Sequence, residues 1–207
     1  AYTRNEQKLE IDRKILALTG ETPEALMALS SSLGVIGGIE QALGQLDTAY
    51  ARYEKRLEVA RNILRLSGET PRGLHGLMNA LLGLGDMERA RGQLDAAYAR
   101  FEQGLGIARK ILAFTGETPR ALRSLSICLA RLGDVERERG QIDRAYARYE
   151  QLLGNSRRIL ALTGETVQAL RDLTVSLALL GDSERASGHL SASVERAAKT
   201  WSNRGCN

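Results

Sequence analysis

One short polar phrase recurs four times in this sequence of 207 residues, and the spacing between its copies is constant. The copies read TGETP, SGETP, TGETP and TGETV and begin at Thr19, Ser67, Thr115 and Thr163, so that each lies 48 residues after the one before. A constant period of this length is typical of repeat proteins, in which each period forms one supersecondary unit. We therefore expect the chain to fold as a series of similar units.

Each copy of the phrase combines a residue that ends a helix with a residue that starts one. Gly can adopt the left-handed backbone conformation that ends a helix, Thr can cap the next helix, and Pro fits the first helical position because no backbone N–H is needed there. The Gly residues are Gly20, Gly68, Gly116 and Gly164, and the Thr residues are Thr22, Thr70, Thr118 and Thr166. The phrase therefore predicts a corner between two consecutive helices.

The segment after each Thr has the apolar spacing of an α-helix, here called an A helix. Leu and Ile recur at steps of three and four, which places them on one face. They are Leu26, Leu29, Leu33 and Ile36; Leu74, Leu77, Leu81 and Leu84; Leu122, Leu125, Leu129 and Leu132; and Leu170, Leu173, Leu177 and Leu180. Each A helix runs to a second corner, which reads GQLD, GQLD, GQID and GHLS. The last residue of each motif is a predicted N-cap of the following helix: Asp47, Asp95, Asp143 and Ser191.

A second helix, here called a B helix, follows the second corner and begins with AYARYE, AYARFE and AYARYE in the first three copies. Residues 1–20 align without a gap with the B helix that begins at Ala49, although no A helix precedes them. Because an initiator Met is also missing, we expect the chain to be part of a longer array. The predicted units are the second helix of an incomplete upstream repeat at 1–21, repeats at 22–69, 70–117 and 118–165, and a degenerate fourth repeat with a C-terminal cap at 166–207. These units contain about nine helices, four A and five B.

The pattern within each period resembles the tetratricopeptide repeat (TPR) family. That family has a large residue and then Leu-Gly on its first helix, a Gly at the turn, and Ala followed by an aromatic residue on its second helix. The matching residues are Leu81, Leu84, Gly85, Gly92, Ala97 and Phe101 in the second repeat, with equivalents at Leu33, Ile36, Gly37, Gly44, Ala49 and Tyr53 and at Leu129, Leu132, Gly133, Gly140, Ala145 and Tyr149. The resemblance covers the whole chain and implies an all-α, right-handed superhelical solenoid of antiparallel helix pairs. The departure is length, since the common repeat of the family has about 34 residues.

Small and aromatic residues at fixed positions of the period indicate how the helices pack. Gly on the A helices and Ala on the B helices are predicted to let paired helices approach closely. The aromatic residues Tyr53, Phe101 and Tyr149 are predicted to fill the space between one helix pair and the next. Burial of each ring would contribute about 2 kcal/mol.

One pair of opposite charges recurs on the A helices. The resemblance implies that A helices form the concave wall of the superhelix and that their outward positions contact partners. Those positions hold Asp86 and Arg89, Asp134 and Arg137, and Asp182 and Arg185. One interpretation is a charged ladder that binds a peptide or protein segment. The other is a set of ion pairs within and between repeats, each contributing about 0 to 1 kcal/mol.

The residue types present favour an interaction module over an enzyme. Basic and acidic residues alternate closely, and the two His and two Cys, which are His75, His189, Cys128 and Cys206, show no metal-ligand or catalytic spacing. No phosphate-binding Gly loop, HExxH or GxSxG motif occurs. The sequence thus predicts a non-catalytic protein–protein interaction scaffold without metal or cofactor. Two alternatives stay open: a regulatory or sensor segment of a larger multidomain signalling enzyme and, less favoured, an RNA-binding helical repeat.

Location and self-association can also be predicted. No stretch approaches the ~18 apolar residues that a membrane span needs, and no secretory signal or disulfide framework is visible, so a cytoplasmic location is expected. Leu9, Ile15 and Leu16 should be uncovered, because no A helix precedes residues 1–20. Exposed apolar surface at the end of an array favours weak self-association through the N-terminal end.

Overall fold

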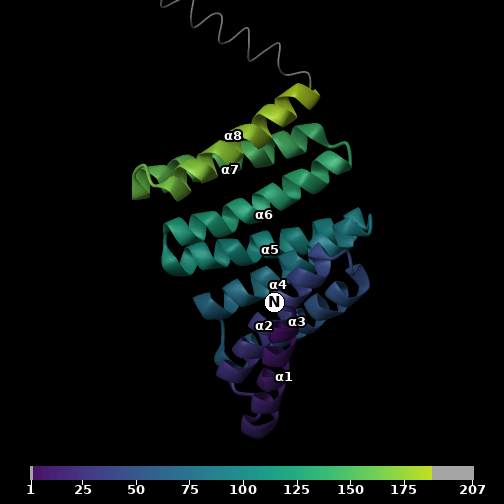
Figure 1. The fold of residues 1–207 in the computed structure, drawn as a ribbon. Coiled ribbons are helices and arrows are strands. Elements are labelled where there is room, and N and C mark those ends of the chain that lie inside the picture. The colour runs from purple at the N-terminus through teal and green to yellow at the C-terminus, as the bar shows by residue number, and fades with distance from the viewer. Residues whose placement is uncertain (1, 188–207) are drawn as a thin grey trace, which may run out of the picture. The chain divides into compact units, whose positions relative to one another are not determined.

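The computed structural model describes residues 2–187, and this range consists of α-helices joined by short corners. Figure 1 shows the helices following one another along the chain. They are α1 (Tyr2–Thr19), α2 (Pro23–Ala42), α3 (Leu46–Ser67), α4 (Pro71–Ala90), α5 (Leu94–Thr115), α6 (Pro119–Glu138), α7 (Ile142–Thr163) and α8 (Val167–Ser187). The even-numbered helices are the A helices and the odd-numbered ones the B helices. The all-α prediction is confirmed, and the expected ninth helix lies outside the described residues.

The chain divides into two compact units, residues 1–128 and residues 129–207, with the boundary inside α6. In the first unit each helix packs against the next along the chain, from α1 on α2 to α4 on α5. The two A helices α2 and α4 also contact one another. In the second unit α8 packs against α7. Sequence neighbours are therefore spatial neighbours within each unit, as in other repeat proteins.

The corner at the TGETP phrase has the geometry that its sequence predicts. Its four Gly residues have φ between +68° and +73°, in the left-handed region that favours Gly. Each Thr then accepts a hydrogen bond through its Oγ1 from the backbone N–H three residues later. The donors and distances are Ala25 at 3.3 Å, Gly73 at 3.2 Å, Ala121 at 3.2 Å and Ala169 at 3.2 Å.

The second corner corrects the predicted caps. The B helices begin one residue before Asp47, Asp95 and Asp143, so these residues are not N-caps. The capping positions are occupied by Gln45, Gln93 and Gln141, whose side chains make no capping hydrogen bond.

The reason for this difference is a backbone motif that ends the A helix. Gly44 has a φ of +74°, and the N–H of Gln45 bonds the carbonyl of Glu40 at 2.9 Å across the end of α2. The chain has then already reversed its direction, and α3 starts at once with Asp47 in its first turn. The carboxylate of Asp47 still interacts favourably with the dipole of α3 at this position. Ser191, the fourth predicted cap, lies outside the described residues.

The predicted apolar face is buried in three of the four A helices. All its residues on α2 and α6 are buried, as are Leu74, Leu81 and Leu84 on α4, where Leu77 is partly buried. On α8 the face is half open, with Leu170 at 43% and Leu177 at 50% exposure. The helical periodicity therefore identifies the core of each helix pair up to α7.

The A-helix glycines make room for aromatic rings rather than for Ala. A Cβ at Gly85 would lie 2.5 Å from Cε1 of Phe101, and one at Gly133 would lie 2.5 Å from the same atom of Tyr149. The ring of Tyr53 lies against Gly37 of its own pair and also against Gly83 of the next A helix. For Tyr53, the prediction of an aromatic ring between successive pairs is thus confirmed.

The first helix is better covered than its sequence predicts. Leu9 is 3% exposed, because its side chain faces α2 and joins a cluster with Leu26 and Ile63. Leu16 is partly buried against the same cluster. The prediction was therefore wrong for Leu9 and Leu16. The large apolar side chains of α1 that are exposed are Ile11, Ile15 and Leu18.

Candidate protein-interaction surface

The first predicted charge pair lies in the C-terminal half of α4. Asp86 and Arg89 are three residues apart and both are half-buried. Asp86 lies close enough to Tyr53 of α3 to affect it electrostatically. Burial raises the pKa of Tyr53, and Arg56 lowers it while Asp86 raises it further. This part of the A helix is therefore neither core nor fully solvated.

The other two pairs belong to the second unit. Asp134 of α6 accepts a hydrogen bond of 2.9 Å from the hydroxyl of Tyr149 and lies 3.9 Å from Nη2 of Arg137. On α8, Asp182 and Arg185 contact one another, and both side chains are exposed. The spacing of three thus places Asp and Arg on one face within these helices. Ion pairs within a repeat exist here, as the second interpretation expects, and they leave 39% of Arg137 and 66% of Arg185 accessible.

A different charge pair, which sequence reasoning missed, joins a buried Glu to a partly exposed Arg in three helix pairs of the described residues. A Glu of the A helix accepts a hydrogen bond through Oε1 from Nε of an Arg on the following B helix. The pairs are Glu40 and Arg52 at 3.2 Å, Glu88 and Arg100 at 3.2 Å, and Glu136 and Arg148 at 3.3 Å. The three carboxylates are 1–3% exposed, whereas the Arg side chains are 19–29% exposed. These pairs join A and B helices at the same position of three repeats.

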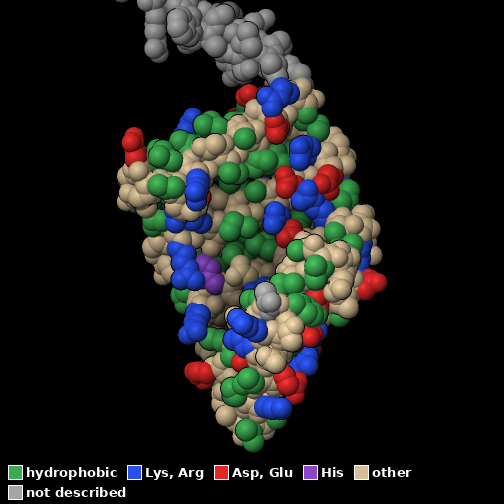
Figure 2. Space-filling model, in the orientation of Figure 1, with side chains coloured by type: hydrophobic (Ala, Val, Ile, Leu, Met, Phe, Trp, Pro, Cys, Tyr) green, Lys and Arg blue, Asp and Glu red, His purple; other side chains and the backbone are tan. Residues whose placement is uncertain are grey.

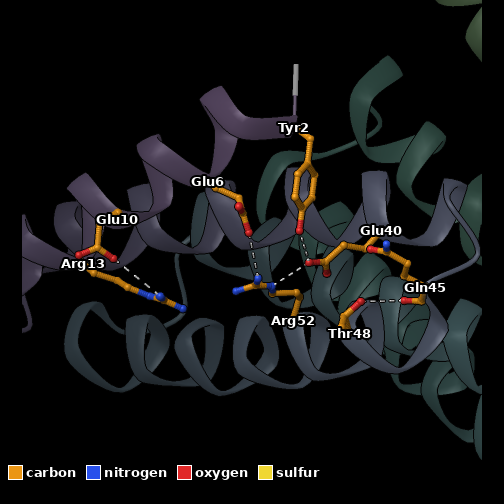
Figure 3. A network of polar contacts seen from close by, with 8 residues as sticks. All are labelled: Tyr2, Glu6, Glu10, Arg13, Glu40, Gln45, Thr48 and Arg52. Carbon is orange, nitrogen blue, oxygen red and sulfur yellow. Dashed lines mark hydrogen bonds and ion pairs between the residues drawn. The ribbon is translucent and has the colours of Figure 1, made fainter.

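The first of these pairs belongs to a larger network, drawn in Figure 3. The hydroxyl of Tyr2 donates to Oε1 of Glu40 over 3.1 Å, and Arg52 also lies 3.7 Å from Glu6 of α1. The second oxygen, Oε2, has no hydrogen-bond partner in Glu40, Glu88 or Glu136 among the described residues. The sequence signal was present, since Glu and Arg recur 12 residues apart in every repeat.

The comparisons with known proteins concern the fold. No family model and no curated protein matches the sequence. Among solved structures, BtubC (BKLC) from P. vanneervenii is 18% identical, with a TM-score of 0.57 over 100% of this chain and 91% of that one. A candidate kinesin light chain from Podosopora anserina with nearly identical TPR-like repeats is 21% identical, with a TM-score of 0.56 over 99% of both chains. The chain has the fold of a TPR protein.

The TPR fold is built here from unusually long helices. The A helices α2, α4 and α6 have 20 residues each, and the B helices α3, α5 and α7 have 22. Since a helix rises about 1.5 Å per residue, each spans roughly 30 Å.

Two grooves of the first unit are lined mainly by residues of its B helices. One has a volume of about 440 Å³ and is lined mainly by α3, with Leu84 of α4 and Arg100 of α5. The other, of about 590 Å³, is lined by α1 and Arg52 of α3. They repeat one motif, because Glu54, Leu57 and Arg61 in the first correspond to Glu6, Leu9 and Arg13 in the second. Both mix Glu with Arg or Lys, so neither groove has a single sign of charge.

The remaining chemistry-bearing residues of the TPR fold are scattered. Nδ1 of His75 lies 3.4 Å from Oγ of Ser124, and burial, with a smaller contribution from Arg120, lowers the pKa of His75. Cys128 is buried in the core. Within residues 2–187, no group of three His, Cys, Asp or Glu side chains could hold a metal ion, and no helix is long and apolar enough to cross a membrane. His189 and Cys206 lie outside the described residues.

Proposed function

We propose that this TPR-fold protein is a non-catalytic scaffold that binds a peptide or protein segment on its A helices. The observation that carries the proposal is the recurrence of Asp86 and Arg89, Asp134 and Arg137, and Asp182 and Arg185 at one register of three A helices, with each pair partly open to solvent. Repetition of one polar pattern in three successive repeats suits an extended ligand. The partners of such a scaffold would be proteins.

The chemistry of this register favours basic or apolar segments as ligands of α4, α6 and α8. An acidic segment would meet Asp86, Asp134 and Asp182, and the repulsion between like charges would oppose binding. RNA is the less suitable partner, because phosphate recognition needs a continuous basic surface. Figure 2 shows Lys and Arg interspersed with Asp and Glu on the face in view.

Affinity capture with matched variants tests the proposal. The test variant carries Arg89→Ala, Arg137→Ala and Arg185→Ala. The control carries Arg61→Ala, Arg109→Ala and Arg157→Ala, which remove three exposed Arg residues at one register of α3, α5 and α7. We expect quantitative mass spectrometry to find partners that the wild type and the control retain and the test variant loses. Equal recovery of partners by the wild type, the control and the test variant would show that the A-helix charges are not the binding surface.

A further inference from the structure

A guanidinium group lies in an unusual place between α2 and α3. Arg56 of α3 lies directly against Gly34 of α2, where a Cβ would be only 2.6 Å from Cζ and 2.7 Å from Nη1 of Arg56. The guanidinium therefore fills the space that a side chain at position 34 would take. Arg56, Gly34 and Gly38, one turn after Gly34, are each partly exposed, so this position is not closed off from solvent.

This guanidinium has no anionic partner among the described residues. Its Nε is buried and makes no hydrogen bond. Burial lowers the pKa of Arg56, and the opposing influence within residues 2–187 comes from Tyr53, a phenol that is neutral at pH 7. Arg stays protonated in proteins, so the group is a cation without a counterion. Such a cation is costly to bury, because it has lost hydration without gaining an ion pair.

The same register in the other repeats shows what is missing. In α1 the equivalent residue is Lys8, which lies 2.9 Å from Asp12 and donates a hydrogen bond of 2.6 Å to Ser32. Arg56 has Ala60 and Ala80 at the positions of Asp12 and Ser32. In α5 and α7 the register holds the uncharged residues Gly104 and Leu152. The chain thus either neutralises a cation at this register or avoids one, except at Arg56.

We propose that Arg56 binds a carboxylate of a bound polypeptide segment, which reaches the guanidinium beside Gly34 and Gly38 of α2. A carboxylate matches the planar donors of Arg and can accept two hydrogen bonds at once. The first repeat suits an anion, because Gly38 replaces the Asp that the other three repeats have there. The carboxylate can come from an Asp or Glu side chain or from a chain terminus. The inference deepens the proposed function, since it names the ligand chemistry of the first repeat.

Side-chain NMR of the 207-residue chain tests this directly, with the ¹⁵Nε–Hε signal of Arg56 as the reporter. The probes are three N-acetylated tripeptides: Gly-Glu-Gly amide, Gly-Gly-Gly with a free C-terminus, and Gly-Gln-Gly amide, which has no carboxylate. Each is titrated at constant ionic strength. We expect a saturable shift with one or both carboxylate peptides, at least about tenfold tighter than with the Gln peptide, as a hydrogen bond to a charged group provides. The two carboxylate peptides distinguish a side-chain source from a terminal one.

Two variants separate binding from folding. Arg56→Leu introduces the residue that α7 carries at this register, and Ala60→Asp with Ala80→Ser reproduces the neutralising set of Lys8 around Arg56. Followed through backbone amides around Gly34, both variants should keep their helical circular dichroism and lose the preference for carboxylate. An equal response to all three peptides, or an unchanged preference in both variants, would overturn the proposal. Loss of this site with partner capture through α4, α6 and α8 intact would leave the proposed function standing.

Discussion

The buried Glu–Arg pair is a residue-scale feature that bears directly on stability. Glu88 is 3% exposed and Arg100 is 29% exposed, so the two partners differ in their access to water. Removal of one partner leaves the other uncompensated, and the penalty depends on whether water can reach it. Substitution of Arg100 and substitution of Glu88 should therefore change the free energy of unfolding by different amounts.

We predict that Arg100→Ala lowers the free energy of unfolding by about 3–5 kcal/mol, because it leaves Glu88 buried and unpaired. Glu88→Ala should lower it less, since Arg100 can turn toward solvent. The exposed pair Lys55 and Glu58 is the control, and Lys55→Ala should change the free energy by about 0–1 kcal/mol. Urea unfolding measures all three. An equal, small effect of Arg100→Ala and Lys55→Ala would contradict the structural role of the buried pair.

Two glycines of the first unit give a matched test of the packing. Gly85→Ala should destabilise by about 1–3 kcal/mol, because its Cβ would meet the buried ring of Phe101. Gly106 is also helical, but a Cβ there would have no atom within 4 Å. Gly106→Ala should therefore stabilise by about 0.5–1 kcal/mol through helix propensity. Thermal or urea unfolding of both variants would reveal the opposite signs, and a shared sign would count against the packing.

The lowered pKa of His75 predicts a pH dependence. Its pKa in the folded state lies below the unfolded value of about 6.5, chiefly through burial and then through Arg120. The unfolded state therefore binds the proton more readily, and stability falls as the pH drops from about 6.5 toward the folded-state pKa. His75→Gln should remove this part of the dependence. NMR titration of Arg120→Ala should show a higher pKa for His75 than in the wild type. A lower pKa in this variant would contradict the assignment that Arg120 lowers the pKa of His75.

At the scale of single helices, the corners depend on local chemistry and differ in how they are capped. Thr70 caps α4 through its side chain, whereas Gln93 at the start of α5 makes no such bond. We predict that Thr70→Ala lowers the free energy of unfolding by about 1 kcal/mol. Gln93→Ala should leave it nearly unchanged. Chemical denaturation compares the two, and an equal loss in both variants would show that the Thr hydroxyl is not the stabilising group.

The helices and first corners could be predicted from the sequence, because caps and apolar periodicity act over a few residues. The second corner could not be placed to the residue, since a backbone hydrogen bond from Gln45 to Glu40 decides where α3 begins. The burial of Glu88 could not be predicted from the sequence either. A charged side chain is expected to face solvent, and Glu88 is paired only because α5 packs against α4 and brings Arg100 to it. Arg56 was missed for the same reason, because Gly34 lies on another helix.

At the scale of the whole molecule, the exposed apolar side chains of α1 bear on self-association. Ile11 is 56% and Leu18 is 87% exposed, so the 207-residue chain presents an apolar face on its first helix. We propose weak association through this face and predict that Ile11→Glu with Leu18→Glu abolishes it. Leu162→Glu on α7, at a site 53% exposed, is the control. Sedimentation velocity across a concentration series measures the association state of the wild type and both variants. A wild type that stays monomeric at every concentration would contradict the proposal.

If a partner lies along the A helices, it should shield their carboxylates, and carboxyl footprinting measures this shielding. The partner recovered by affinity capture is added to the full chain, and carbodiimide labelling of each carboxylate is measured by mass spectrometry with and without it. We expect labelling to fall at Asp86, Asp134 and Asp182 and to stay unchanged at the B-helix residues Glu54, Glu102 and Glu150, which share one register. Protection of those three glutamates with unchanged labelling of the three aspartates would contradict it.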